Sequence, residues 1–151
     1  MREVNNSEDV LDSRDVIARR DELKEEREGL VSDVEDARQE EDNDQPEDRA
    51  GRVKDAEDAL KEWDEENAEE LAALEAFIDE GSSSWEDGET LVRESYFEDY
   101  ARELADDVVE NFRERSSQWP FSCIDWEQAA RELQHDYTGA DFDGVTYYYR
   151  A

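Results

Sequence analysis

The chain has 151 residues, enough for one domain or for a small domain with an appendage. Charged residues make up 43% of it and hydrophobic residues only 36%, so little apolar area opposes the conformational entropy lost on folding. The 48 acidic and 17 basic residues give a formal charge of -31. This charge excludes ordinary binding to nucleic acid or to an anionic membrane, because the phosphates would be repelled. Any protein partner is expected to be basic.

From Ser13 to about Glu41 the sequence predicts a helix with Ser13 as its N-cap. Apolar residues recur every seven positions, with one further apolar residue between them, as in a thin coiled-coil seam: Val16, Leu23, Leu30, Val34 and Ala37. The turn formers of residues 42–49 then end this helix.

A second helix is expected from about Gly51 to Glu80, since apolar residues there are mostly three or four positions apart. Two helices of similar length joined by a short polar turn predict a long antiparallel, coiled-coil-like hairpin over residues 1–80. Trp63 and Phe77 would lie on its seam and pack either within one chain or between two. The alternative is a fluctuating acidic segment.

Residues 81–88 are expected to form a linker to a C-terminal module, residues 89–151. Twelve of the fifteen aromatic residues follow residue 95, so this module can bury a core. A third helix is predicted from about Thr90 to Phe112, and a fourth, capped by Asp125, over residues 126–137. Residues 138–144 are expected to form a turn and residues 145–150 a short strand. The expected fold class is therefore mainly α: a long helical hairpin followed by a compact helical module with a short strand.

Catalytic and metal-binding patterns are weak in this sequence. His135 is the only histidine, and Cys123 would have to approach it in space to form a nucleophile–base pair. Asp141, Asp143 and Gly144 resemble the start of a calcium loop, but the glutamate that such a loop needs at its twelfth position would fall beyond Ala151. We expect no enzyme, no cofactor and no designed metal site.

The single cysteine excludes an internal disulfide and argues for a reducing compartment. The sequence has neither an apolar run long enough for a membrane span nor a signal peptide at its start. A cytoplasmic protein is expected.

The acidic residues occur in runs, and acids three or four positions apart on a helix form a line along one face. Such fixed carboxylates can imitate the phosphates of duplex DNA and attract proteins with basic grooves. A solvated helix face, protection from aggregation and adaptation to high salt would each account for the runs of acids as well. Salt adaptation agrees with the three lysines against fourteen arginines.

Three blocks of the C-terminal module resemble, in the same order, the C-terminal region of the ArdA antirestriction family of plasmids and phages. They are YFEDYARELADDV (96–108), WPFSCIDWEQAARELQHDY (119–137) and FDGVTYYYR (142–150). The resemblance covers less than half of the chain, and the predicted hairpin stands where that family has other N-terminal domains. Members of the family are elongated, acidic DNA mimics that act as dimers and occupy the DNA groove of type I restriction-modification enzymes.

The resemblance implies a non-enzymatic inhibitor in the cytoplasm of a host cell, with the basic DNA-binding groove of a type I restriction enzyme or another nuclease as its partner. It implies a possible homodimer, and Trp119, Ile124, Trp126, Leu133 and Tyr137 as residues that hold the module together. The acids expected to stand in for phosphates are Glu94, Glu98, Asp99, Glu103, Asp106, Asp107 and Glu110 on the third helix, and Glu127, Glu132 and Asp136 on the fourth.

Two further classes of function remain open. One is a structural or assembly protein whose hairpin dimerises and whose acidity is salt adaptation. The second is an acidic chaperone for a basic protein.

Overall fold

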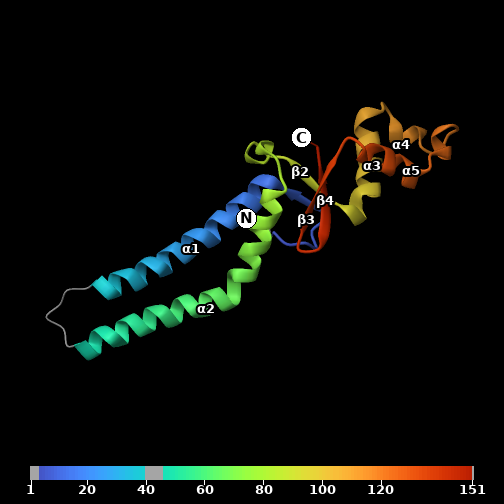
Figure 1. The fold of residues 1–151 in the computed structure, drawn as a ribbon. Coiled ribbons are helices and arrows are strands. Elements are labelled where there is room, and N and C mark those ends of the chain that lie inside the picture. Colours follow the sequence, from blue (N-terminus) through green and yellow to red (C-terminus); the bar gives the residue numbers. More distant parts are fainter. Residues whose placement is uncertain (1–3, 40–45, 151) are drawn as a thin grey trace. The chain divides into compact units, whose positions relative to one another are not determined.

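The computed structural model describes residues 4–39 and 46–150. These residues are mainly α-helical, with five α-helices and one four-stranded antiparallel sheet (Figure 1). The chain divides into two compact units. One consists of Ile17–Glu75, and the other combines Met1–Val16 with Ala76–Ala151. The C-terminal unit therefore also contains the first strand of the chain and the last turn of the second helix.

The unit Ile17–Glu75 is built from most of α1 (Ser13–Gln39) and α2 (Pro46–Asp79). Of the apolar residues expected on the α1 seam, Leu23, Val34 and Ala37 are buried. α2 begins at Pro46, earlier than the predicted Gly51, because proline fits the first turn of a helix, where its missing N–H group is not needed. Part of the turn predicted over residues 42–49 lies outside the described residues.

Arginine side chains of α1 form ion pairs with carboxylates of α2. Arg19 pairs with Glu70 at 2.9 Å, Arg27 with Asp64 at 2.9 Å, and Arg38 with Glu57. The arginines that come later in α1 pair with carboxylates that come earlier in α2.

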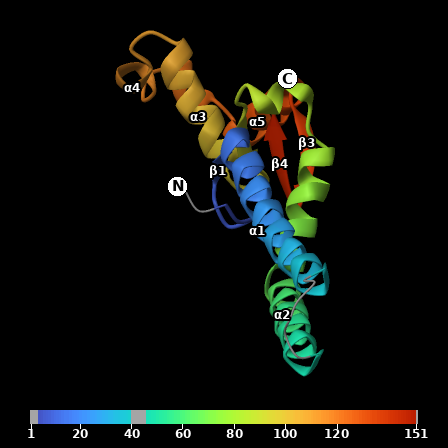
Figure 2. The ribbon, with the colours of Figure 1, turned by 90° about the vertical axis from the view of Figure 1, so that its left-hand side faces the viewer.

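The sheet of the C-terminal unit has the strand order β1-β2-β4-β3 (Figures 1 and 2). Each neighbouring pair is antiparallel, and Val92 of β2 lies opposite Tyr148 of β4. The strands are β1 (Val10–Asp12), β2 (Thr90–Arg93), β3 (Thr138–Phe142) and β4 (Val145–Tyr149). The predicted final strand is confirmed as β4, whereas the sequence patterns did not predict β1, β2 or β3.

The helix predicted from Thr90 to Phe112 was wrong at both ends. Residues 90–93 form β2, and α3 runs only from Phe97 to Val108. Leu91 and Val92, adjacent in sequence, are both fully buried. A strand buried on both faces accommodates neighbouring apolar residues, because successive side chains point to opposite faces.

The turn predicted over residues 138–144 is instead a β-hairpin, with β3 leading into a tight turn at Asp143 and Gly144. Both turn residues have positive φ, 50° and 87°, as a two-residue hairpin turn of the primed type requires. The N–H of Gly144 donates to the Asp141 carboxylate at 2.8 Å. The residues that resembled a calcium loop thus serve to close this hairpin.

The segment expected to be a linker, residues 81–88, contributes one residue, Trp85, to the core. Trp85, on a 3-10 helix at Ser83–Glu86, is only 1% exposed. The Trp85 ring packs edge-on against Phe77 and Tyr149, with ring centroids 5.0 Å and 5.2 Å apart. The Phe77 ring stacks on the Phe142 ring, with their centroids 4.7 Å apart. Phe77 therefore belongs to an aromatic cluster of the C-terminal unit.

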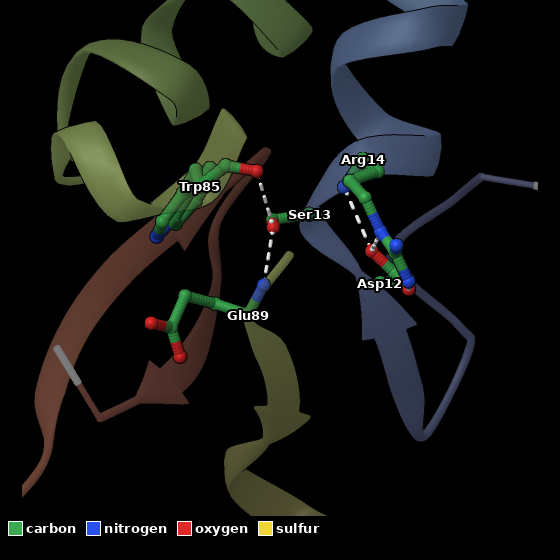
Figure 3. A network of polar contacts seen from close by, with 5 residues as sticks. All are labelled: Asp12, Ser13, Arg14, Trp85 and Glu89. Carbon is green, nitrogen blue, oxygen red and sulfur yellow. Dashed lines mark hydrogen bonds and ion pairs between the residues drawn. The ribbon is translucent and has the colours of Figure 1, made fainter. Parts of the chain in front are cut away.

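Ser13 was expected to cap α1, but Asp12 does so: its carboxylate accepts the N–H of Arg14 at 2.8 Å (Figure 3). The fully buried Ser13 hydroxyl instead donates to the Trp85 carbonyl at 2.8 Å and accepts the N–H of Glu89 at 2.7 Å. This hydroxyl joins the start of α1 to segments more than seventy residues away.

A second core cluster joins β2, α3 and α5 (Trp126–Gln134). Its buried members are Val92, Phe97, Ala101 and Ala130, with partly buried tyrosines around them. Asp125 caps α5 as predicted, since its carboxylate accepts the N–H of Gln128 at 3.2 Å. The predicted end of that helix, residue 137, lies past the observed end at Gln134.

Candidate functional site

The outer face of α3 carries half of the acids selected from the sequence. Phe97 and Ala101 are buried on the opposite face of this helix, against the sheet and α5. The five acids that lie on α3 are Glu98, Asp99, Glu103, Asp106 and Asp107, all exposed except Asp106, which is partly buried. The amphipathic pattern of α3 therefore fixes five carboxylates on a helix held in place by an aromatic core.

Two further acids predicted for the same helix lie beside it. Glu94 belongs to a 3-10 helix, Glu94–Tyr96, and Glu110 follows the end of α3 at Val108. Both side chains are exposed. On α5, Glu127 and Glu132 are exposed, while Asp136 lies just beyond the end of the helix.

Arginines partly neutralise this acidic surface. Glu98 pairs with Arg102 at 3.5 Å, Asp106 with Arg113 at 2.8 Å, and Glu127 with Arg131 at 3.9 Å. The ion pairs and side-chain hydrogen bonds described for this unit leave out five of the ten selected acids: Glu94, Asp99, Asp107, Glu110 and Asp136. The pairs Glu98–Arg102 and Glu127–Arg131 have the i,i+4 spacing that can be recognised in a helical sequence. The pair Asp106–Arg113 depends instead on how the chain turns after α3.

The structure brings three of the selected acids together. Glu103, Asp106 and Asp107 line one groove of about 480 Å³, which Arg102 and Arg113 also line. The hydroxyl of Tyr96 donates to Glu103 at 2.5 Å, and this hydrogen bond raises the pKa of Tyr96 to about 12. The groove thus has mixed charge, with acids in excess.

The residues expected to hold the module together do so with one exception. Ile124, Trp126, Leu133 and Tyr137 are partly buried, and the Tyr137 ring meets Phe97 edge-on at 5.2 Å. Trp119, in contrast, is 81% exposed, so the prediction for this residue was wrong.

Two phenylalanines near Trp119 in the sequence, Phe112 and Phe121, pack in the module instead. Phe112 is the first residue of α4 (Phe112–Arg115). The centroid of its ring lies 5.8 Å from that of the Trp126 ring and 6.1 Å from that of the Phe121 ring. Trp119 lies in an exposed stretch between these two phenylalanines, where the residues that pack could not be chosen from hydrophobicity alone.

The structure does not bring together the residues considered for a nucleophile–base pair. Cys123 and His135 are both exposed, and none of the hydrogen bonds described for residues 4–39 and 46–150 joins them. Within those residues no group of three or more His, Cys, Asp or Glu side chains is arranged to hold a metal ion. None of the described helices has the length and apolar character needed to cross a membrane.

No family model, curated protein or solved structure matches the chain. The ArdA resemblance therefore rests on the quoted sequence motifs alone.

Proposed function

We propose that the protein is a non-enzymatic antirestriction inhibitor that mimics DNA and occupies the DNA-binding groove of a host restriction enzyme or another nuclease. The observation that carries this proposal is the row of exposed carboxylates on α3, backed by the core of Val92, Phe97, Ala101 and Ala130. A fixed row of carboxylates presents negative charge at defined positions, as the phosphates of a duplex do. Acids on an unfolded segment would also lose backbone entropy on binding, and a segment already folded as a helix avoids that cost.

The proposed mechanism of inhibition follows from the net charge. With a formal charge of -31, the chain attracts a basic groove over long range, and such steering accelerates association. Once bound, the protein would exclude DNA by occupying the same cationic side chains. The acids would act together as a field, so replacing one of them should change inhibition little, and replacing several should reduce it progressively.

We further propose that α1 and α2 form an antiparallel, coiled-coil-like hairpin that adds to the acidic surface. This proposal is supported by the opposite order of the three ion pairs Arg19–Glu70, Arg27–Asp64 and Arg38–Glu57. The burial of the seam residues Leu23 and Val34 supports it as well.

The test is DNA cleavage by a purified type I restriction enzyme, with the protein titrated in at low and at moderate salt. Inhibition that competes with added DNA and fades as salt screens the charges is expected. Absence of inhibition at both salt concentrations by a protein that circular dichroism shows to be folded would contradict inhibition of this enzyme class.

A charge-matched pair of variants tests which acids matter. One replaces Asp99, Asp107 and Glu110 with the corresponding amides, and the other does the same at Asp58, Glu62 and Glu66 of α2. Both variants lose the same charge. The first should weaken inhibition more, and equal weakening would mean that net charge, not the α3 surface, determines binding.

The second candidate is a structural or assembly protein whose α1–α2 pair dimerises and whose acidity is salt adaptation. It is favoured by apolar α2 residues that stay partly exposed, such as Val53 and Leu60. Circular dichroism across salt concentrations separates the two, because this candidate requires molar salt for folding and DNA mimicry does not.

A further inference from the structure

An open groove lies between α1 and α2, wholly within the unit Ile17–Glu75. Its volume is about 560 Å³, and its apolar part is formed by Val31 and Val34 of α1 and Leu60 of α2. On each helix the lining residues include positions i, i+3, i+4 and i+7, so the groove follows one face of each helix for about two turns. Its shape is that of a trough along the helices.

Two ion pairs mark the ends of this trough. Arg27 pairs with Asp64 at 2.9 Å, and Arg38 pairs with Glu57. In sequence, Val31 and Val34 lie between the two arginines, and Leu60 lies between the two carboxylates. Val31 and Leu60 are only partly buried, so apolar surface between the bridges still contacts water. Covering it would be favourable, at roughly 25 cal/mol for each Å² removed from water.

The charge around the trough indicates what kind of molecule can cover it. α2 contains thirteen acidic and four basic residues. Glu35 and Glu65 also line the trough, with Lys61 as the one lining cation that is not in a described bridge between the helices. A second copy of the chain would bring the same acidic surroundings against these acids. A basic partner meets no such repulsion.

We propose that this trough binds a basic amphipathic helix of a partner protein, with the apolar stripe of that helix over Val31, Val34 and Leu60. The mode is that of a helix laid in a groove, in which apolar residues at i, i+3, i+4 and i+7 anchor and the flanking residues select by charge. Lysines or arginines beside the stripe would face Glu35 and Glu65. This inference does not rest on the proposed DNA mimicry, because it concerns a different unit and requires an apolar contact.

The probe is a fluorescently labelled synthetic peptide of about 18 residues, long enough to form a helix, with leucine at every third or fourth position and lysine elsewhere. Two comparison peptides are a scrambled sequence of the same composition and a version with glutamate in place of lysine. Fluorescence anisotropy at moderate salt with the full chain should show saturable one-to-one binding of the first peptide. Binding of the scrambled peptide with the same affinity would overturn the proposal, since it would show charge attraction alone.

Matched substitutions locate the binding site. Leu60→Asn should weaken binding of the amphipathic peptide by about tenfold or more, as expected for loss of a central apolar anchor. Leu71→Asn alters another partly buried leucine of α2 outside the trough and should leave affinity within about twofold of wild type. Circular dichroism checks that both variants are folded.

A second pair does not depend on the apolar positions. Glu65→Gln should weaken binding more than Glu66→Gln, because only Glu65 lines the trough. Equal affinities for the members of each pair would overturn the proposal. So would a concentration-dependent dimer that Leu60→Asn dissociates, because the trough would then be covered by a second copy.

Discussion

At the scale of single residues, Ser13 is a sensitive position of the C-terminal unit, because its hydroxyl is the partner of two backbone groups. Replacing Ser13 with alanine leaves the Trp85 carbonyl and the Glu89 N–H without this partner in a buried place. We expect a loss of about 1–3 kcal/mol in the free energy of unfolding. Urea denaturation followed by circular dichroism measures it. Ser32→Ala, at an exposed serine of α1, is the control and should change stability little. Equal stabilities would show that water replaces the hydroxyl.

We expect Tyr147 to make the C-terminal unit sensitive to alkali. The residue is fully buried, its hydroxyl donates to the Glu8 carbonyl, and burial raises its pKa to about 12. Since an unfolded tyrosine ionises near pH 10, its contribution to stability is fully present below that pH. The contribution is lost as pH rises from about 10 to 12, and amounts to on the order of 2 kcal/mol.

Denaturation measured at several pH values between neutral and strongly alkaline tests this expectation for Tyr147. Tyr147→Phe should be less stable at neutral pH, because the Glu8 carbonyl loses its donor, yet its stability should fall less steeply above pH 10. Identical slopes for the two proteins would indicate that other tyrosines dominate. Burial also raises the pKa values of Tyr137, Tyr148 and Tyr149, so part of the slope will persist in the variant.

At the scale of elements, the predictions that succeeded rest on local signals. The apolar spacing of α1 and α2 and the Asp125 cap of α5 are local features, and the structure contains all three elements. Strand β1 has only three residues and pairs with β2, which lies about eighty positions further along the chain. No local sequence pattern predicts a pairing between strands so far apart in the chain. Trp85 was assigned to a linker for the same reason, since serines and glycines surround it.

The candidate site was predicted from the sequence only in part. The exposure of the α3 acids follows from the amphipathic pattern, which the sequence contains. The neutralisation of Asp106 by Arg113 does not, because it depends on the bend of the chain after Val108. Likewise, hydrophobicity gave no means of distinguishing the exposed Trp119 from the packed Phe112 and Phe121.

Glycines of the helices provide an element-scale test. A Cβ added at Gly29 of α1 would meet nothing within 4 Å. Gly29→Ala should therefore raise the free energy of unfolding by about 0.5–1 kcal/mol, since alanine loses less backbone entropy in a helix. Gly144→Ala is the matched control: the added Cβ again meets nothing, but φ is +87°. That variant should be less stable than wild type, and stabilisation by both changes would contradict the backbone argument. Thermal denaturation compares the three proteins.

At the scale of the whole molecule, the charge makes stability depend on salt in a predictable direction. Salt screens the repulsion among the 48 acids, which stabilises the folded chain, and it also weakens surface ion pairs, which destabilises it. Exposed pairs contribute only about 0–1 kcal/mol each, and acids exceed bases almost threefold, so relief of repulsion should dominate. The melting temperature should rise as sodium chloride is increased from about 0.05 to 0.5 M, because the screening length falls roughly threefold over this range. The buried aromatic and aliphatic core should keep the chain folded at the lower salt concentration.

A chain that circular dichroism shows to be unfolded until molar salt is reached would instead support salt adaptation. A melting temperature that falls with salt would mean that the arginine bridges between α1 and α2 contribute more than the repulsion they oppose.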